Sequence, residues 1–131
     1  MRYKCQHTVC SPASVSAGNR YEAQVCKDLD RLFPGEFEFQ RKTHNGIMDA
    51  FCKRLPQIIV EIKLTQTADA YYQLERYAKR YPCAARVIIT RTVVLSISTP
   101  EPPVYLPKLQ DLFATEMGGY YIIPYQGKTS K

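Results

Sequence analysis

The sequence predicts an α/β fold in which one helix precedes three strands and a second helix leads to a fourth strand. Two observations support this prediction. Apolar residues recur at helical spacing from Tyr21 to Phe33 and again from Ala70 to Tyr81. Short runs rich in β-branched residues lie between and after these segments, separated by turn-forming residues. Because a helix between two strands is typical of a parallel crossover, we expect a mixed central sheet flanked by helices.

The length and composition indicate one domain with a real hydrophobic core. The chain has 131 residues, of which 45% are hydrophobic. We expect an N-terminal arm over residues 1–17, a core over 18–92 and a C-terminal appendage over 93–131. No apolar run reaches the roughly 20 residues that cross a bilayer, and the first residues lead into no apolar signal segment. The sequence therefore predicts a cytoplasmic protein without a membrane partner.

The first half of the chain reads as a helix followed by three strands. The helix is expected to begin near Asn19 and to end at Pro34-Gly35. Strands are expected over residues 36–43, 47–53 and 57–64, and Asn45-Gly46 is a strong signal for a hairpin turn between the first two. Since the connections are short, these strands should form an antiparallel meander.

The second half begins with a helix over residues 68–81, which Pro82 ends, and a strand over residues 85–92. Residues 93–98 either extend that strand or form another one. Residues 99–107 contain four prolines and cannot be an interior strand or a helix. A short third helix should run from Leu109 through Met117 to the glycines at 118 and 119. A last strand over residues 120–125 should lie at the sheet edge, because it contains Pro124.

Charged residues interrupt two of the predicted strands. One face of the 57–64 strand is wholly apolar, whereas the other carries Glu61 and Lys63 beside Ile59. Asp49 likewise interrupts an apolar pattern in the preceding strand. Charges in such places are costly unless they are paired or bind a metal. If the two strands pair, Asp49 and Glu61 can lie close together, and a hard divalent cation such as Mg²⁺ would relieve their repulsion.

Glu22 is a candidate third ligand, because helical geometry places it beside Val25 and Cys26 on the inward side. Each of these acids also has a structural explanation. Asn19 to Glu22 matches a capping box, which requires no catalytic role. Glu61 and Lys63 could form an exposed ion pair on an edge strand, and Asp49 could be a solvated acid near a turn.

The net charge of +6 is concentrated in one part of the chain. Residues 41–91 contain ten basic and four acidic residues, and the rest of the chain has eight of each. The whole excess therefore surrounds Asp49 and Glu61, and a basic field attracts phosphate backbones. A solvated basic face without a partner is the alternative.

The five cysteines form no Cys-x-x-Cys pair and are odd in number. Three of them fall in predicted helices or strands, so we expect buried thiols in a reducing compartment. Cys5, His7 and Cys10 could serve as zinc ligands, but a fourth ligand is missing nearby and the spacing is not a standard one.

Four segments together resemble the PD-(D/E)XK nuclease superfamily. They are Gly18-x-x-x-Glu22, Gly46-Ile47-Met48-Asp49, Ile59-Val60-Glu61-Ile62-Lys63 and Gln73-x-x-x-Tyr77. The resemblance covers residues 18–92. The layout of these segments is similar to that of Holliday junction resolvase-type nucleases, and the Gln-x-x-x-Tyr motif is similar to that of RecB-like exonucleases. Met48 stands where the nominal motif has proline. The resemblance implies a restriction-endonuclease-like αβββαβ core with an added C-terminal helix and strand.

The resemblance also implies roles for individual residues. Asp49, Glu61 and Glu22 would hold Mg²⁺ or Mn²⁺, together with the carbonyl of Ile62. Lys63 would orient the attacking water or stabilise charge on the phosphate, and Gln73 would contact the site or the substrate. The residues expected to contact DNA are Arg41, Lys42, Lys53, Arg54, Arg76, Tyr77, Lys79 and Arg80.

The function implied by the resemblance is a metal-dependent DNA nuclease, expected to be a structure-selective endonuclease in DNA repair, recombination or phage DNA processing. Two alternatives remain open: a RecB-like exonuclease subunit, and a nucleic-acid-binding module that keeps the fold without catalysis. A homodimer would explain paired cuts in a symmetric substrate. Tyr71 and Tyr72 could stack on an unpaired base, although packing within the helix fits their pattern better.

Overall fold

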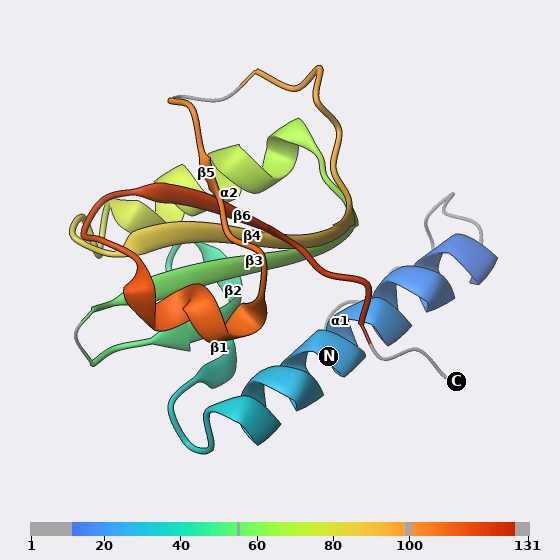
Figure 1. Ribbon diagram of the computed structural model, residues 1–131, viewed down its shortest axis with the longest axis horizontal. Coiled ribbons are helices and arrows are strands. Elements are labelled where there is room, and N and C mark those ends of the chain that lie inside the picture. Colours follow the sequence, from blue (N-terminus) through green and yellow to red (C-terminus); the bar gives the residue numbers. More distant parts are fainter. Residues whose placement is uncertain (1–11, 55, 99–100, 128–131) are drawn as a thin grey trace.

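The α/β class predicted from the sequence is confirmed. The computed structural model describes residues 12–54, 56–98 and 101–127. Within these ranges the order is α1 (Pro12–Leu32), β1 (Glu38–Thr43), β2 (Gly46–Cys52), β3 (Ile58–Thr65), α2 (Ala68–Ala78), β4 (Ala85–Thr92), β5 (Val104–Tyr105), the 3₁₀ helix η1 (Leu109–Ala114) and β6 (Tyr120–Pro124). The first six elements follow the expected αβββαβ order (Figure 1).

The described strands form one mixed sheet in the order β1-β2-β3-β4-β6-β5. The pairs β1–β2 and β2–β3 are antiparallel, which confirms the meander. β4 runs parallel to β3 in a register that places Glu61 opposite Ile88, so α2 is the predicted crossover. β3 and β4 lie at the centre of the sheet, and their long apolar runs match strands that are buried on both faces.

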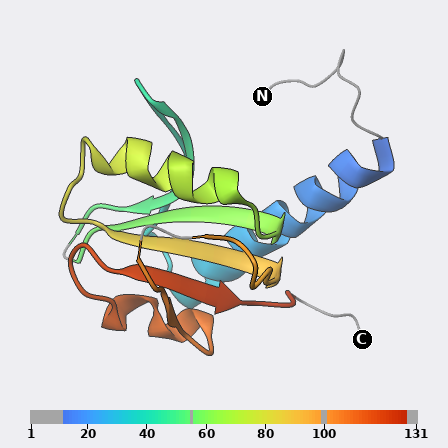
Figure 2. The same cartoon turned by 90° about the horizontal axis from the view of Figure 1, so that it is seen from above.

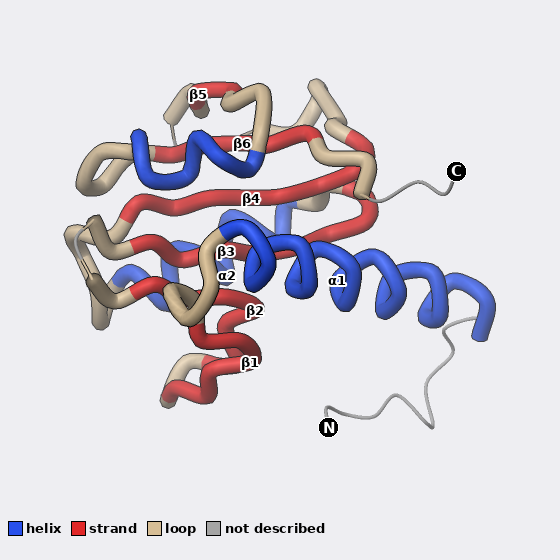
Figure 3. Tube along the Cα trace, turned by 60° about the horizontal axis from the view of Figure 1, so that its bottom comes forward, coloured by secondary structure: helices blue, strands red, loops and turns tan. Residues whose placement is uncertain are grey.

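The sheet separates two hydrophobic clusters. On one face, Tyr21, Val25 and Leu29 of α1 pack with Val60 and with Leu112 of η1. On the other face, the α2 stripe packs on the sheet; its buried members are Ala70, Tyr71, Leu74, Tyr77 and Ala78. Figure 2 shows α2 on one side of the sheet and η1 on the other, and Figure 3 shows α1 running across the face opposite α2.

Helix α1 begins earlier than expected. The prediction of a start near Asn19 is wrong, since the helix runs from Pro12 and includes residues 12–17 of the expected N-terminal arm. Proline is well suited to a first helical position, and a single interior glycine such as Gly18 costs only about 1 kcal/mol. The apolar stripe, which starts at Tyr21, marks only the part of the helix that packs on the sheet.

The β1–β2 hairpin is bent at one residue. Phe39 pairs with Ala50 and Arg41 pairs with Met48, while Gln40 between them has a φ of 55°. Met48 consequently joins the cluster under α2, although Ala50 belongs to the cluster under α1. Strict alternation placed Met48 and Ala50 on the same face, and that prediction is wrong because the backbone turns over at this point. The hairpin tip therefore reaches toward α2 (Figure 2).

Three expectations for the C-terminal part are wrong. Residues 93–98 form neither an extension of β4 nor another strand. The third helix is a 3₁₀ helix that ends at Ala114, where the Thr115 hydroxyl donates to the Leu112 carbonyl (2.8 Å), and Met117 is 66% exposed. β6 is an interior strand, because it lies between β4 and β5. β5 pairs with it only at Tyr121 and Ile122, so Pro124, which has no N–H to donate, lies beyond that pairing.

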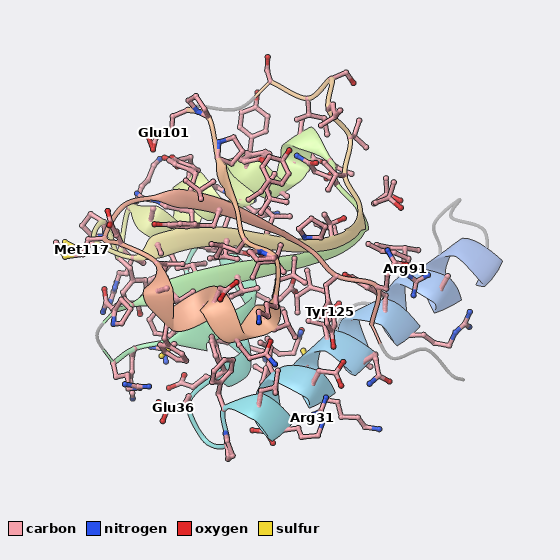
Figure 4. All side chains as sticks on the ribbon, viewed as in Figure 1. Arg31, Glu36, Arg91, Glu101, Met117 and Tyr125 are labelled. Atoms are coloured by element: carbon pink, nitrogen blue, oxygen red, sulfur yellow. The ribbon has the colours of Figure 1, made fainter. Side chains whose placement is uncertain are left out.

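The segment after β6 is fastened to α1. The Tyr125 hydroxyl donates to the Asp28 carboxylate, and the Tyr21 hydroxyl donates to the Tyr125 carbonyl (2.7 Å). Asp28 is only 3% exposed and also accepts from Gln24 (2.9 Å) and Arg31 (3.3 Å). Figure 4 shows Tyr125 beside α1, with Arg31 near the end of that helix.

Candidate active site

The predicted acids gather where β2 and β3 separate. The pairing of β2 with β3 runs from Cys52 and Ile58 to Ala50 and Val60. At the next position the carboxylate of Asp49 replaces the strand, because its Oδ2 accepts a hydrogen bond from the backbone N–H of Ile62 (2.8 Å). The backbone pairing ends at Ala50 and Val60, which leaves a gap between the strands, and the Asp49 carboxylate bridges this gap.

Glu61 is the most deeply buried of these acids, with 3% of the residue exposed. Its Oε1 lies 4.0 Å from the ammonium nitrogen of Lys63, whose side chain is 35% exposed. Its Oε2 is buried and has no hydrogen-bond partner among the described residues. A buried carboxylate oxygen without a partner is costly and marks a place where a proton or a cation would be stabilised.

Glu22 reaches the same region from α1. It accepts a hydrogen bond of 2.5 Å from the side-chain amide of Gln40. Asn19 lies within the helix, so Glu22 is not the third residue of a capping box. The prediction that Glu22 belongs to a capping box is therefore wrong.

The three carboxylates lie close enough to affect one another. Burial, followed by the charge of Glu22, raises the pKa of Asp49 above its usual range, although the Ile62 N–H and Lys63 oppose the shift. Burial, followed by the charge of Asp49, raises the pKa of Glu61 as well, and Glu22 adds to the effect. Like charges held together in this way favour uptake of a proton or a cation.

The simple explanations for Glu61 and Asp49 also fail. β3 is a central strand and Glu61 is buried, so Glu61 and Lys63 are not an exposed pair on an edge strand. Asp49 is partly buried and bonded to a neighbouring strand, which excludes a solvated acid near a turn.

Helix α2 contributes Tyr77 to this region. Its hydroxyl donates to the Ile47 carbonyl (2.7 Å), and its pKa is raised by burial and then by the carboxylates of Glu61 and Asp49. Gln73 lies one turn earlier, accepts a hydrogen bond from Arg76 (2.9 Å) and faces Gly46 at the hairpin tip. Tyr77 is thus the member of the Gln-x-x-x-Tyr motif that approaches the carboxylates.

Five of the eight residues expected to contact DNA line one groove of about 570 Å³ between the hairpin tip and the end of α2. We call it the basic groove; it is lined by Arg41, Lys42, Thr43, His44, Asn45, Tyr77, Lys79, Arg80 and Tyr81. The other three lie elsewhere. Lys53 and Arg54 pair with Glu38 and Glu36, and Arg76 lies on the outer side of α2.

Two residues near the acids carried no signal in the sequence. Gln40 is one member of an ordinary alternating strand pattern, yet its positive φ and its bond to Glu22 help to shape the site. Cys26 lies close enough to Glu22 and Asp49 that both raise the pKa of its thiol, after the larger effect of burial. The role of Gln40 could not be inferred from residue type and spacing, because it depends on the bend in the hairpin. Helical spacing places Cys26 beside Glu22, but only the packing of α1 on the sheet brings it near Asp49.

The donors fit a hard divalent cation in chemistry but do not form a finished ligand set. No group of three or more His, Cys, Asp or Glu side chains in the described ranges is arranged to hold a metal ion. Asp49 is turned toward the Ile62 N–H and Glu22 toward Gln40. Carboxylate oxygens are the ligands that Mg²⁺ and Mn²⁺ prefer, and the buried Oε2 of Glu61, which has no hydrogen-bond partner among the described residues, could coordinate such an ion. Cys5, His7 and Cys10 lie outside the described residues.

The chain matches no family model, no curated protein and no solved structure. Among the described helices, none has the length and apolar character needed to cross a membrane.

Proposed function

We propose that this protein is a metal-dependent DNA nuclease that hydrolyses phosphodiester bonds and acts as a structure-selective endonuclease. The observation that carries the proposal is the closeness of the partly buried Asp49 and the buried Glu61 beside Lys63, at the point where β2 and β3 separate. An α/β scaffold has no structural need for such charges, since an apolar residue would fill the same place at lower cost.

The chain's own residues divide the work of the proposed reaction. Glu22, Asp49, Glu61 and the carbonyl of Ile62 would hold Mg²⁺ or Mn²⁺. When bound, the ion would lower the pKa of a coordinated water and offset charge on the scissile phosphate. Lys63 lies at the partly exposed rim, where its ammonium can stabilise the negative charge that develops on the phosphate. The Ile62 N–H donates to the Asp49 carboxylate and so fixes its position between the two strands, where it would serve as a metal ligand.

The distribution of positive charge supports nucleic acid as the substrate. The basic groove lies between the hairpin tip and the end of α2, and Tyr77, which lines it, also approaches Glu61 and Asp49. Phosphate contacts of this kind position a backbone without reading its sequence. A substrate chosen by DNA structure rather than by a long base sequence is consistent with this arrangement.

The test compares cleavage by wild-type protein with cleavage by Asp49→Asn and Lys63→Met in Mg²⁺ or Mn²⁺. Substrates should include closed circular, linear and branched DNA. We expect wild-type protein to cut, and each variant to lose at least about a hundredfold in rate, the scale of removing one group that stabilises transition-state charge. Cutting of the circle identifies an endonuclease, whereas cutting of linear DNA alone would favour the exonuclease.

The matched control is Glu116→Gln, which removes one exposed acid on the turn after η1. It should cut like the wild type, and circular dichroism should show all variants folded. DNA binding without cleavage in any divalent ion would instead support the non-catalytic module. Undiminished cutting by folded Asp49→Asn would refute the proposed site.

A further inference from the structure

The basic groove has the features of a ligand site in its own right. Its volume of about 570 Å³ lies within the range of roughly 300–1,000 Å³ that is usual for small-molecule sites. Four of its nine lining residues are Lys or Arg, and none of these nine described residues is acidic. The ligand that fits such charge is an anion.

Pairing within the protein explains only part of the positive charge, since Arg41 pairs with Glu38. Lys79 and Arg80 follow α2, where cations offset the helix dipole, but Arg41 and Lys42 come from a different element on the opposite wall. Lys42, Lys79 and Arg80 are all exposed. Like charges that face one groove repel one another, and an anion bound between them would relieve that repulsion.

One wall of the groove is aromatic and fixed in place. The Tyr81 ring packs against Phe51 with ring centroids 4.7 Å apart, and its hydroxyl accepts a hydrogen bond from Arg41 (3.2 Å). Arg41 is itself held by Glu38 and lies over the Phe51 ring. A preorganised ring beside cationic side chains is the combination that binds a nucleobase together with its phosphate.

The groove adjoins the carboxylates. Tyr77 lines it, and its hydroxyl donates to the Ile47 carbonyl (2.7 Å). Ile47 lies two residues before Asp49 on β2. A chain lying in the groove can therefore continue past Tyr77 toward the proposed cutting site.

We infer that the basic groove binds one or two nucleotides of an unpaired DNA strand, with phosphates on Lys42, Lys79 and Arg80 and a base against Tyr81. A duplex keeps its base faces within its own stack, so only an unpaired nucleotide presents a face to this ring. The inference deepens the proposed function and rests on it only in the claim that the bound strand leads to the carboxylates. It names a substrate class: DNA with an unpaired segment next to the cut.

The experiment measures binding in EDTA by fluorescence anisotropy, using full-length Asp49→Asn protein. The probes are a 12-nucleotide single strand and a blunt 12-base-pair duplex. In this background, Lys79→Gln/Arg80→Gln should weaken single-strand binding about tenfold and lower the slope of log affinity against log salt by about 1.4, at about 0.7 for each phosphate contact. Duplex binding should change less than twofold.

The matched control is Arg20→Gln/Lys108→Gln, which removes the same charge from exposed positions outside the groove. Equal losses from the groove pair and the control pair would overturn the inference, as would equal losses for single strand and duplex. Inorganic polyphosphate should compete poorly at equal phosphate concentration, because it has no bases. Efficient competition would show that the groove is a site for polyanions in general.

A second variant tests the aromatic wall. Tyr81→Leu should weaken single-strand binding by about five- to a hundredfold, the range for one base–aromatic stack. Tyr81→Phe keeps the ring and should bind like the parent protein, so a loss in both would point to the Arg41 contact or to folding instead. Since all binding is measured without metal, absence of cleavage by the wild type would refute the nuclease and leave the groove assignment standing.

Discussion

Glu61 is the residue whose surroundings most restrict what the site can do. Its carboxyl group is buried, one of its oxygens has no partner among the described residues, and its cationic neighbour Lys63 is 4.0 Å away and partly exposed. Burial and the charge of Asp49 raise its pKa, so the folded protein resists ionising this group. The site therefore stores an electrostatic cost that a bound cation would relieve.

Glu61→Gln should stabilise the metal-free protein at pH 8 by about 1–3 kcal/mol, because it removes a charge that burial disfavours. The folded pKa lies above the ordinary value of 4.5, so the penalty in the wild type is absent below that pH and grows as pH rises toward the folded pKa. The gain should disappear at pH 4.5. Urea unfolding at both pH values measures it.

The opposite dependence on pH would contradict this account of Glu61. A variant that is less stable than the wild type at pH 8 would show that the carboxylate is paired favourably in the folded state. Glu116→Gln, at an exposed position after η1, is the control for a general effect of removing one acid.

At the scale of elements, the bent β1–β2 hairpin creates the site. Gln40 adopts a φ of 55°, which L residues with branched side chains avoid, and its amide holds Glu22. The tip is held in turn by α2, because Asn45 donates to the Arg76 carbonyl (2.8 Å) and Tyr77 donates to Ile47 (2.7 Å). These contacts keep β2 away from β3 beyond Ala50.

Gln40→Val should destabilise the fold by about 1–3 kcal/mol, since a β-branched residue is strained at positive φ. Gln40→Gly tolerates that backbone and should cost less than Gln40→Val, although both lose the bond to Glu22. Chemical denaturation of the two variants separates backbone strain from the lost hydrogen bond. Equal stability of the two would show that the bend is not retained in solution.

At the scale of the whole molecule, the C-terminal strand closes the structure onto the N-terminal helix. β6 pairs with β4 in the sheet interior, and the residue after it, Tyr125, bonds to Asp28 of α1. The hydrogen bond from Tyr125 and those from Gln24 and Arg31 outweigh burial and lower the pKa of Asp28. The two ends of the described chain thus support each other and hold α1, which carries Glu22.

Tyr125→Phe should cost about 1–3 kcal/mol, the scale of leaving a buried carboxylate without one of its donors. Asp28 has a lowered folded pKa, so its contribution is present above its ordinary value of 3.8 and is lost as pH falls through the folded pKa. The difference between wild type and variant should therefore shrink in strong acid. Thermal unfolding at pH 7 and pH 3 measures this, and a constant difference would contradict it.

Metal binding should also appear as a property of the whole fold. A ligand present at a hundred times its dissociation constant stabilises the folded state by about 2.7 kcal/mol. Mn²⁺ should raise the midpoint of thermal unfolding for the wild type and have little effect on Asp49→Asn. A similar shift in both proteins would place the ion elsewhere.

Much of the architecture followed from local patterns. Helical spacing, β-branched runs and the Asn-Gly turn predicted α2, the meander and β4, because each depends on residues close together in the chain. β4 has the expected bounds, whereas α2 ends at Ala78, three residues before the expected end at Tyr81. The errors arose where contacts between distant segments determine the position or the bounds of an element. The two-residue β5 covers β6 and makes it interior, and the start of α1 is not marked by the apolar stripe.

The sequence alone determined the order of elements, the two faces of β3 and the presence of Asp49, Glu61 and Lys63 in otherwise apolar strands, since alternation is a local property of the backbone. Tertiary structure decided which of these charges meet. The gap that Asp49 fills, the bond between Gln40 and Glu22, and the joining of Arg41 with Lys79 and Arg80 in one groove all arise from the bent hairpin. Its course depends on contacts with α1 and α2 that no short segment encodes.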